Sequence, residues 1–300
     1  MTETLVPRDE LAVDNVLGPP NRVVITADSA QSSLRLSELL EYADLFRFFI
    51  WREVKVRYAQ SALGISWAVF QPLVTALIMM VAFGYFAKIP TENAPRFLFY
   101  FCALVPWTFF SSAVTDGTAS LVNNAQMLGK VYFPRIILPL ASMVARSIDF
   151  LIAFFVLIVL MLFDGLIPTP KALLIPVLCL VMLTAAVGVG LWLTALAIQY
   201  RDVKYATTFM VQLMMFASPV IYPVSGIPDR YVLGDLTVNP QHIYALNPMA
   251  GVIEGFRCSL LGTSNIPWTM IGIGSVSAMF VAVTGVMFFR HKERIFADVA

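Results

Sequence analysis

The sequence has little charge, and what it has is unevenly spaced. Only 13% of its 300 residues are charged, against about 25% in an average soluble domain. Long stretches contain no charged side chain at all: between Arg57 and Lys88, Lys171 and Arg201, Lys204 and Asp229, and Arg257 and Arg290. Each stretch exceeds the ~20 apolar residues that an α-helix needs to cross a bilayer. This pattern excludes a soluble globular domain and predicts a membrane protein.

Residues that carry most enzyme chemistry are also scarce. Cys102, Cys179 and Cys258 stand alone, which argues against a disulfide framework or a thiolate metal site. His242 and His291 lie outside any metal-binding or nucleophile motif, and no glycine-rich phosphate loop occurs. A net charge of +1 gives no reason to expect a nucleic-acid partner. We therefore expect no catalytic residue, metal or cofactor in this chain.

The apolar stretches predict six transmembrane helices in an all-α membrane protein. We place them at Gly64–Ala87, Phe97–Asp116, Pro139–Phe163, Ala172–Ile198, Ala206–Tyr222 and Trp268–Phe289. An excess of Lys and Arg marks the cytoplasmic side of a membrane protein. Here it falls on both terminal segments and on the connections that share their side, so both termini are predicted to be cytoplasmic. The richest inner segments hold Arg47, Arg52, Lys55, Arg57, Arg290, Lys292 and Arg294.

Polar and amphipathic segments precede the first span. Residues 1–36 have few large apolar side chains and are predicted to be a flexible polar tail. Residues 37–58 carry an apolar stripe that predicts an amphipathic helix in the cytoplasmic membrane interface. The stripe comprises Leu39, Ala43, Phe46, Ile50 and Val54, opposite Arg52 and Lys55. The alternative is a soluble helix packed on a partner. Residues 59–300 then form one transmembrane domain.

The segment Val224–Pro267 differs from the other outer connections, which are short. Its apolar pieces are interrupted by glycine and proline, and they are too short to span a bilayer. Such pieces fit re-entrant or gate helices that are buried against protein.

Two charged pairs have helical i, i+3 spacing. Arg146 and Asp149 lie in the third predicted span, where pairing lowers the cost of burying charge. We favour a salt bridge near the cytoplasmic interface, and a proton or ion relay is the alternative. Glu254 and Arg257 repeat the spacing in the outer segment, where we expect a solvated pair.

Aromatic side chains and one proline mark a possible passage. Some rings of the first and fifth spans can bind the apolar faces of sugars, although most such rings form membrane belts or packing. Pro72 breaks the hydrogen-bond ladder of the first span and frees a carbonyl near Ala68. That face is therefore expected to lie away from lipid. The channel candidates are Trp67, Phe70, Pro72, Tyr85, Phe209, Phe216 and Tyr222.

The connection Leu121–Pro139 has apolar side chains beside basic ones. We expect Val131, Tyr132 and Phe133 to be exposed on the cytoplasmic side, where they would dock a soluble partner. The alternative is a loop that packs against its own bundle.

Four separated motifs resemble the membrane subunit of ABC-2 type polysaccharide exporters, the family of O-antigen, capsular polysaccharide and teichoic acid exporters. They are Trp51–Tyr58 followed by Ser61–Pro72, then Asn124–Pro139, Ser218–Pro223 and Tyr244–Pro248. The resemblance implies a homodimer that works with two copies of a separate ATPase, which binds ATP and Mg. It also implies that Tyr244 and Asn247 belong to an outer gate. The coupling segment that it implies contains Asn124, Met127, Lys130, Val131, Tyr132, Phe133 and Arg135.

From this resemblance we expect a permease subunit, multi-pass in the bacterial inner membrane, that exports a lipid-linked polysaccharide of O-antigen type. The alternatives are an ABC-2 exporter of a drug or small lipid, and an ion-coupled secondary transporter that uses Arg146 and Asp149.

Overall fold

The computed structural model describes residues 41–59, 61, 64–128, 133–200, 202–228, 231–233 and 236–293. The predicted tail 1–36 and the first residues of the predicted interfacial helix lie outside this part. The described helices and strands are α2 (Ala43–Tyr58), η3 (Gly64–Ser66), α3 (Trp67–Met79), η4 (Met80–Phe86), α4 (Arg96–Asn123), α5 (Ala125–Leu128), α6 (Ile137–Phe163), η5 (Pro170–Leu174), α7 (Ile175–Gln199), α8 (Val203–Phe216), η6 (Val224–Gly226), β1 (Tyr231–Leu233), β2 (Leu236–Val238), α9 (Pro240–Tyr244), α10 (Pro248–Leu260) and α11 (Trp268–Glu293).

Five helical segments of the described chain are long and apolar enough to cross a membrane. They cover Gly64–Phe86, Arg96–Asn123, Ile137–Phe163, Pro170–Gln199 and Trp268–Glu293, so five of the predicted spans are confirmed with small changes at their ends. The segment predicted at Ala206–Tyr222 is different. Its helix, α8, has 14 residues and ends at Phe216, which at 1.5 Å per residue gives a length of about 21 Å.

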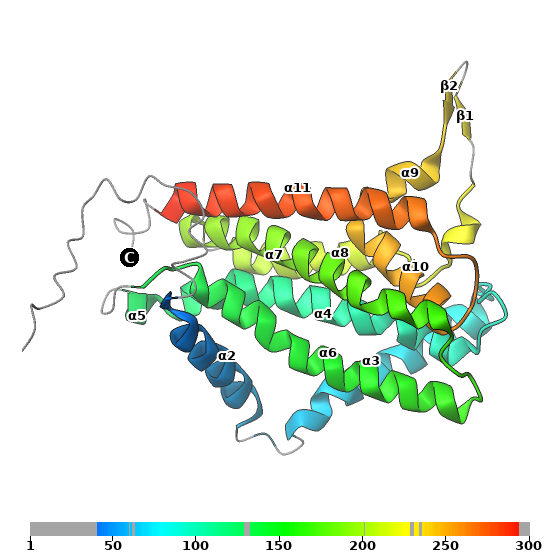
Figure 1. Ribbon diagram of the computed structural model, residues 1–300, viewed down its shortest axis with the longest axis horizontal. Coiled ribbons are helices and arrows are strands. Elements are labelled where there is room, and N and C mark those ends of the chain that lie inside the picture. Colours follow the sequence, from blue (N-terminus) through cyan, green and yellow to red (C-terminus); the bar gives the residue numbers. More distant parts are fainter. Residues whose placement is uncertain are drawn as a thin grey trace, which may run out of the picture. The chain divides into compact units, whose positions relative to one another are not determined.

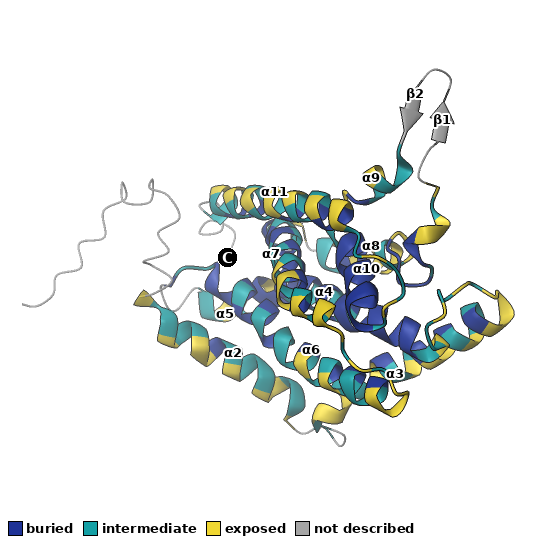
Figure 2. Ribbon diagram, turned by 45° about the vertical axis from the view of Figure 1, so that its right-hand side comes forward, coloured by how far each residue is buried: buried dark blue, intermediate teal, exposed yellow. Residues whose placement is uncertain are grey.

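Helix α4 is the centre of the bundle. It packs against α3, α6, α7, α8 and α10, and most of its residues are buried (Figure 2). A mostly apolar helix that is buried on nearly every side is typical of such a position. The second predicted span is thus the core around which the others pack.

Helices α7 and α11 run side by side (Figure 1) and meet through two glycines. A Cβ atom on Gly188 would lie 2.6 Å from the backbone nitrogen of Ala282, and one on Gly285 would lie 2.5 Å from the carbonyl oxygen of Gly188. Because no side chain fits there, the two backbones approach directly, as small residues allow between membrane helices.

Helix α3 contains two irregularities. Pro72 is buried inside it, at the position where the sequence predicts a break in the ladder. The helix then continues as the π-helical segment η4, which the sequence analysis did not predict. Wide turns of this kind are frequent at functional sites.

The segment after α8 is irregular and leads into the short helices α9 and α10. Ala217–Pro223 has no regular helix and is followed by η6, a hairpin, α9 and α10. The hairpin pairs β1 and β2 antiparallel, with Tyr231 opposite Val238 and Leu233 opposite Leu236. Apart from this short hairpin the described secondary structure is helical, in agreement with the prediction of an all-α protein.

Helix α2 packs on α6, and Phe46 and Ile50 of the predicted apolar stripe lie partly buried against the bundle. Phe49 is its buried residue, and Arg52 and Arg57 turn toward the bundle, where both make polar contacts. Phe48 and Trp51 are exposed instead. The amphipathic pattern places Arg52 on the polar face of the helix, but its hydrogen bond to Asn124 directs the side chain toward the bundle.

Candidate functional site

A polar groove runs between α3, α4, α6 and α8. It has a volume of about 360 Å³. Its walls combine the indole rings of Trp67 and Trp107 with hydroxyl and amide side chains, and Arg146 and Asp149 lie at one end. The hydroxyl and amide groups come from Gln71, Thr75, Thr108, Ser111, Ser112 and Gln212. A groove of this composition can bind a ligand that has both hydroxyl groups and flat apolar faces.

The predicted channel residues divide between this groove and the surface. Trp67 and Pro72 line the groove. Phe70, Tyr85, Phe209 and Phe216 are exposed large side chains on α3, η4 and α8, but they do not line it. Sequence reasoning missed the groove face of α4. Thr108, Ser111 and Ser112 follow i, i+3, i+4 spacing, and this polar stripe in an apolar span could have been found.

The charged pair predicted in the third span is part of a larger cluster. We call Arg57, Asp116, Arg146 and Asp149 the charge ring, because each arginine contacts both aspartates. Arg146 lies 2.6 Å from Asp116 and 3.0 Å from Asp149, and Arg57 lies 3.2 Å from Asp116 and 3.0 Å from Asp149. Cations and anions thus alternate around a closed square contributed by α2, α4 and α6.

Tyr58 completes the ring from α2, since its hydroxyl donates a hydrogen bond to Asp149. Burial and the neighbouring Asp149 carboxylate raise the pKa of Tyr58 to about 12, so the hydroxyl stays protonated at physiological pH. With Arg57 and Tyr58, the last turn of α2 supplies two of the groups that hold the aspartates. The sequence spacing gave the Arg146–Asp149 contact but not the partners from the other helices.

A second charged pair is buried, which corrects the prediction of a solvated one. The side chain of Arg257 is 0% exposed and that of Glu254 is 4% exposed, with 3.5 Å between Nη1 and Oε2. Arg257 also donates to the carbonyl oxygens of Val220 at 2.7 Å and Tyr222 at 3.2 Å. These carbonyls belong to the irregular segment after α8, where no helical partner is available. Arg257 therefore satisfies backbone groups that would otherwise be buried without partners.

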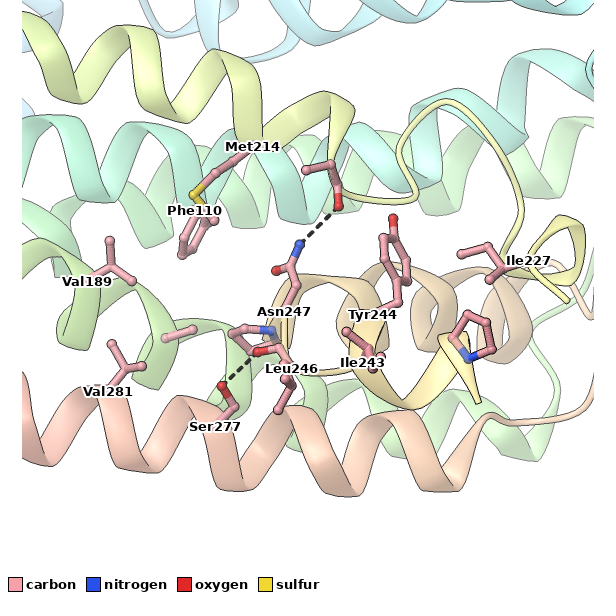
Figure 3. A pocket seen from close by; sticks show the side chains of 14 residues that line it. Phe110, Val189, Met214, Ile227, Ile243, Tyr244, Leu246, Asn247, Ser277 and Val281 are labelled. Atoms are coloured by element: carbon pink, nitrogen blue, oxygen red, sulfur yellow. Dashed lines mark hydrogen bonds between the residues drawn. The ribbon is translucent and has the colours of Figure 1, made fainter. Parts of the chain in front are cut away.

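Asn247 and Tyr244 hold the same irregular segment. Asn247 donates to Ser218 Oγ at 2.9 Å and caps α10 by accepting from the backbone N–H of Met249. The hydroxyls of Tyr244 and Tyr222 are 3.1 Å apart. Tyr244 and Asn247 also line an apolar cavity of about 690 Å³ beside α7 and α11 (Figure 3). The predicted channel residue Tyr222 and the predicted gate residues Tyr244 and Asn247 are thus in one hydrogen-bonded cluster, since the backbone N–H of Asn247 also donates to the carbonyl oxygen of Tyr244.

The predicted coupling segment is described only in part, because Lys130, Val131 and Tyr132 lie outside the described residues. Asn124 directly follows α4 and accepts a 2.8 Å hydrogen bond from Arg52 of α2. Met127 lies in the short helix α5. Phe133 is only 5% exposed and packs on Phe49 with 5.6 Å between ring centroids. The expectation that Phe133 is exposed for docking was therefore wrong, because α2 covers it.

Arg135 anchors the end of the same segment. Its backbone N–H donates to Glu293 Oε1 of α11 at 3.1 Å. The connection between α4 and α6 is therefore attached to α2 at one end and to α11 at the other.

Comparison with known proteins places this architecture in a family. Residues 44–261 match the ABC-2 type transporter family. The O-antigen export system permease protein RfbA of Myxococcus xanthus is 30% identical over 221 residues, which cover 73% of this chain and 81% of that protein. A protein of the same name from Klebsiella pneumoniae is 26% identical over 269 residues, 89% of this chain and 99% of that protein. The polysialic acid transport protein KpsM of Escherichia coli is 25% identical over 234 residues, 74% and 88% of the two chains.

The family match begins in α2 and ends just after α10, so it includes the charge ring, the groove and the Arg257 contacts. With its apolar helices, the chain is a multi-pass inner-membrane protein. Because the match covers most of its length, the chain belongs to the ABC-2 type transporter family.

Proposed function

We propose that this chain is the permease subunit of an ABC transporter that exports a lipid-linked polysaccharide of O-antigen type. The observation that carries the proposal is the similarity over 89% of the chain to a relative named as an O-antigen export permease. The polar groove supports it, because hydroxyls, amides and indoles suit a sugar chain. The chain itself carries no phosphate loop, so a separate ATPase supplies the energy, and ATP and Mg bind there.

The proposed topology has six crossings with both termini in the cytoplasm. The sixth crossing combines α8 with the irregular segment Ala217–Pro223, whose carbonyls Arg257 satisfies. In this topology α9 and α10 are re-entrant gate helices, and residues 37–58 lie in the cytoplasmic interface. The unpaired α3 and α8 surfaces, with Phe70 and Phe209 exposed, face a second copy of the chain across the glycan path. Two ATPase copies complete the transporter.

The proposed coupling segment is Asn124–Arg135, which faces the ATPase. Its attachment to α2 through Arg52 and to α11 through Glu293 supports this role, because movement of the segment would reach both helices. Two residues of the segment provide a test. Tyr132→Ala should weaken co-purification of the ATPase, whereas Phe133→Ala should mainly lower stability, since Phe133 packs under α2.

Gene deletion in the source bacterium tests the function directly. The expected result is loss of surface glycan together with accumulation of the lipid-linked polymer inside the cell. Unchanged surface glycan would refute the proposal. Altered resistance to a drug with normal glycan would indicate the drug or small-lipid exporter, and transport by the purified chain without an ATPase would indicate the secondary transporter.

A bulky substitution in the groove tests the path. Ser112→Trp fills space between α3 and α4 and should abolish export while the protein still reaches the membrane. Val276→Trp on α11 is the matched control, because Val276 is exposed away from the groove and the variant should export normally. Equal export by both variants would remove the groove from the path.

A further inference from the structure

The charge ring lies between two polar spaces. On one side is the polar groove, which Arg146 and Asp149 line. On the other is a cavity of about 520 Å³, here called the arginine cavity, which is lined by Arg52, Arg57, Asp116 and Arg146 among others. Arg146 borders both spaces. The side chains of the ring are therefore the wall that separates them.

The wall is held by electrostatic contacts that can be exchanged. The four side chains are 16–31% exposed, so each borders water-accessible space while keeping both of its partners. A close-packed apolar wall would have to be repacked before it opened. Ion pairs beside polar cavities can instead exchange their partners for water molecules, because such pairs contribute little net stability when solvent can replace them.

Helix α2 connects this wall to the proposed coupling segment. Arg52 contacts Asn124 at 2.8 Å, and one and a half turns later Arg57 and Tyr58 hold the two aspartates. Asn124 is also tied to α4 by its hydrogen bond to the Ser120 carbonyl. A displacement of α2 relative to α4 and α6 would remove two of the four ring contacts at once, those of Arg57, and would also withdraw Tyr58.

We propose that the charge ring is an inner gate, which closes the polar groove from the arginine cavity and opens when α2 shifts. The direction of movement through the gate rests on the proposed export function. The position of the ring between the two spaces is a property of the geometry. Arg57 is the ring residue that α2 contributes, and its replacement removes two of the four ring contacts, so we expect it to open the gate.

Cysteine labelling in sealed inside-out vesicles tests the gate. A single reporter, Ser112→Cys, is placed in the groove of a full-length protein whose native cysteines are replaced, and a membrane-impermeant maleimide is added from the cytoplasmic side. With the ring intact, labelling should be slow. Arg57→Gln should raise the labelling rate at least tenfold. Arg47→Gln is the matched control, because Arg47 lies on α2 but outside the ring, and it should leave the rate unchanged.

A second reporter and a second variant keep the test decisive. Asn123→Cys lies in the arginine cavity and should be labelled rapidly in every background, which shows that the reagent reaches the cavity. The SDS-unfolding midpoint of each variant shows whether it is folded. Asp116→Asn preserves shape and should also accelerate labelling of Ser112→Cys, so it replaces Arg57→Gln if that variant does not fold. Slow labelling of Ser112→Cys in a ring variant that is folded would refute the gate proposal. The measurement needs no glycan, so it is independent of the export assay.

Discussion

The guanidinium of Arg257 provides a demanding test of how α10 and the irregular segment after α8 are held together. It is fully buried, makes an ion pair with Glu254, and donates to the carbonyls of Val220 and Tyr222. Replacing it by methionine keeps the size but leaves a buried carboxylate without its cation, which costs about 3–5 kcal/mol. We expect Arg257→Met to lose stability of that order.

A double variant separates the charge from the hydrogen bonds. In the double variant Arg257→Met, Glu254→Gln no uncompensated buried charge remains. The remaining loss of stability comes from the carbonyl groups that lose their hydrogen-bond donor, about 1–3 kcal/mol. The double variant should therefore be more stable than the single one. Arg96→Met serves as the control, because Arg96 is an exposed cation above Tyr85, where a cation–π contact contributes about 0.5–1 kcal/mol.

The single variant should also depend on pH. Burial raises the pKa of Glu254, and Arg257 opposes that rise, so removing the arginine raises the pKa further. An acid whose folded-state pKa exceeds its unfolded value is most stabilising when protonated, and this stability is lost as the pH rises toward the folded-state pKa. Arg257→Met should thus be more stable at pH 5.5 than at pH 8, and the double variant should not share this dependence.

The assay is unfolding in mixed micelles with increasing SDS, followed by tryptophan fluorescence. The reasoning would be refuted if Arg257→Met stayed within about 1 kcal/mol of the unchanged protein, below the cost of an unpaired buried charge. Equal losses in the single and double variants at pH 8 would refute it as well.

Two further substitutions test the packing by the same measurement. Gly188→Leu should destabilise the protein strongly, because a Cβ there would lie 2.6 Å from the backbone of Ala282 and overpacking costs about 1–3 kcal/mol or more. The control Gly272→Leu has nothing within 4 Å of its Cβ position and should be nearly neutral. Similar losses of stability in both variants would contradict the close crossing of α7 and α11. Asn247→Ala removes the N-cap of α10 and should cost about 0.5–2 kcal/mol of stability. Asn239→Ala should cost less, because Asn239 caps only the short helix α9. The reverse order would contradict the capping role of Asn247.

Most of the membrane helices could be predicted because burial in lipid leaves a long, charge-free signature. The exception, Ala206–Tyr222, has the same apolar composition, but Pro219 and Pro223 end the helical pattern. There Arg257, which is distant in the sequence, donates hydrogen bonds to the backbone carbonyls. Hydropathy reports how apolar a segment is and not whether its backbone is helical. The π-helical segment η4 was missed for the same reason.

The charged residues show where the limit of sequence reasoning lies. A spacing of i, i+3 places Arg146 with Asp149 and Glu254 with Arg257 on one helical face, but it does not say what that face meets. Arg57 and Asp116 are 59 residues apart, and nothing local indicates that they join. Arg257 could have been suspected, because it stands in the apolar piece Met249–Leu261 with a single acid beside it.

The glycine crossing of α7 and α11 also gives the molecule a fixed reference. The backbones touch directly at Gly188 and Gly285, and Trp192 of α7 stacks on Phe288 of α11, so we expect these two helices to move as one unit. Spectroscopic labels on this pair should report one constant distance throughout a transport cycle. Any distance change measured from this pair to α2, α3 or α8 can then be assigned to the other helix.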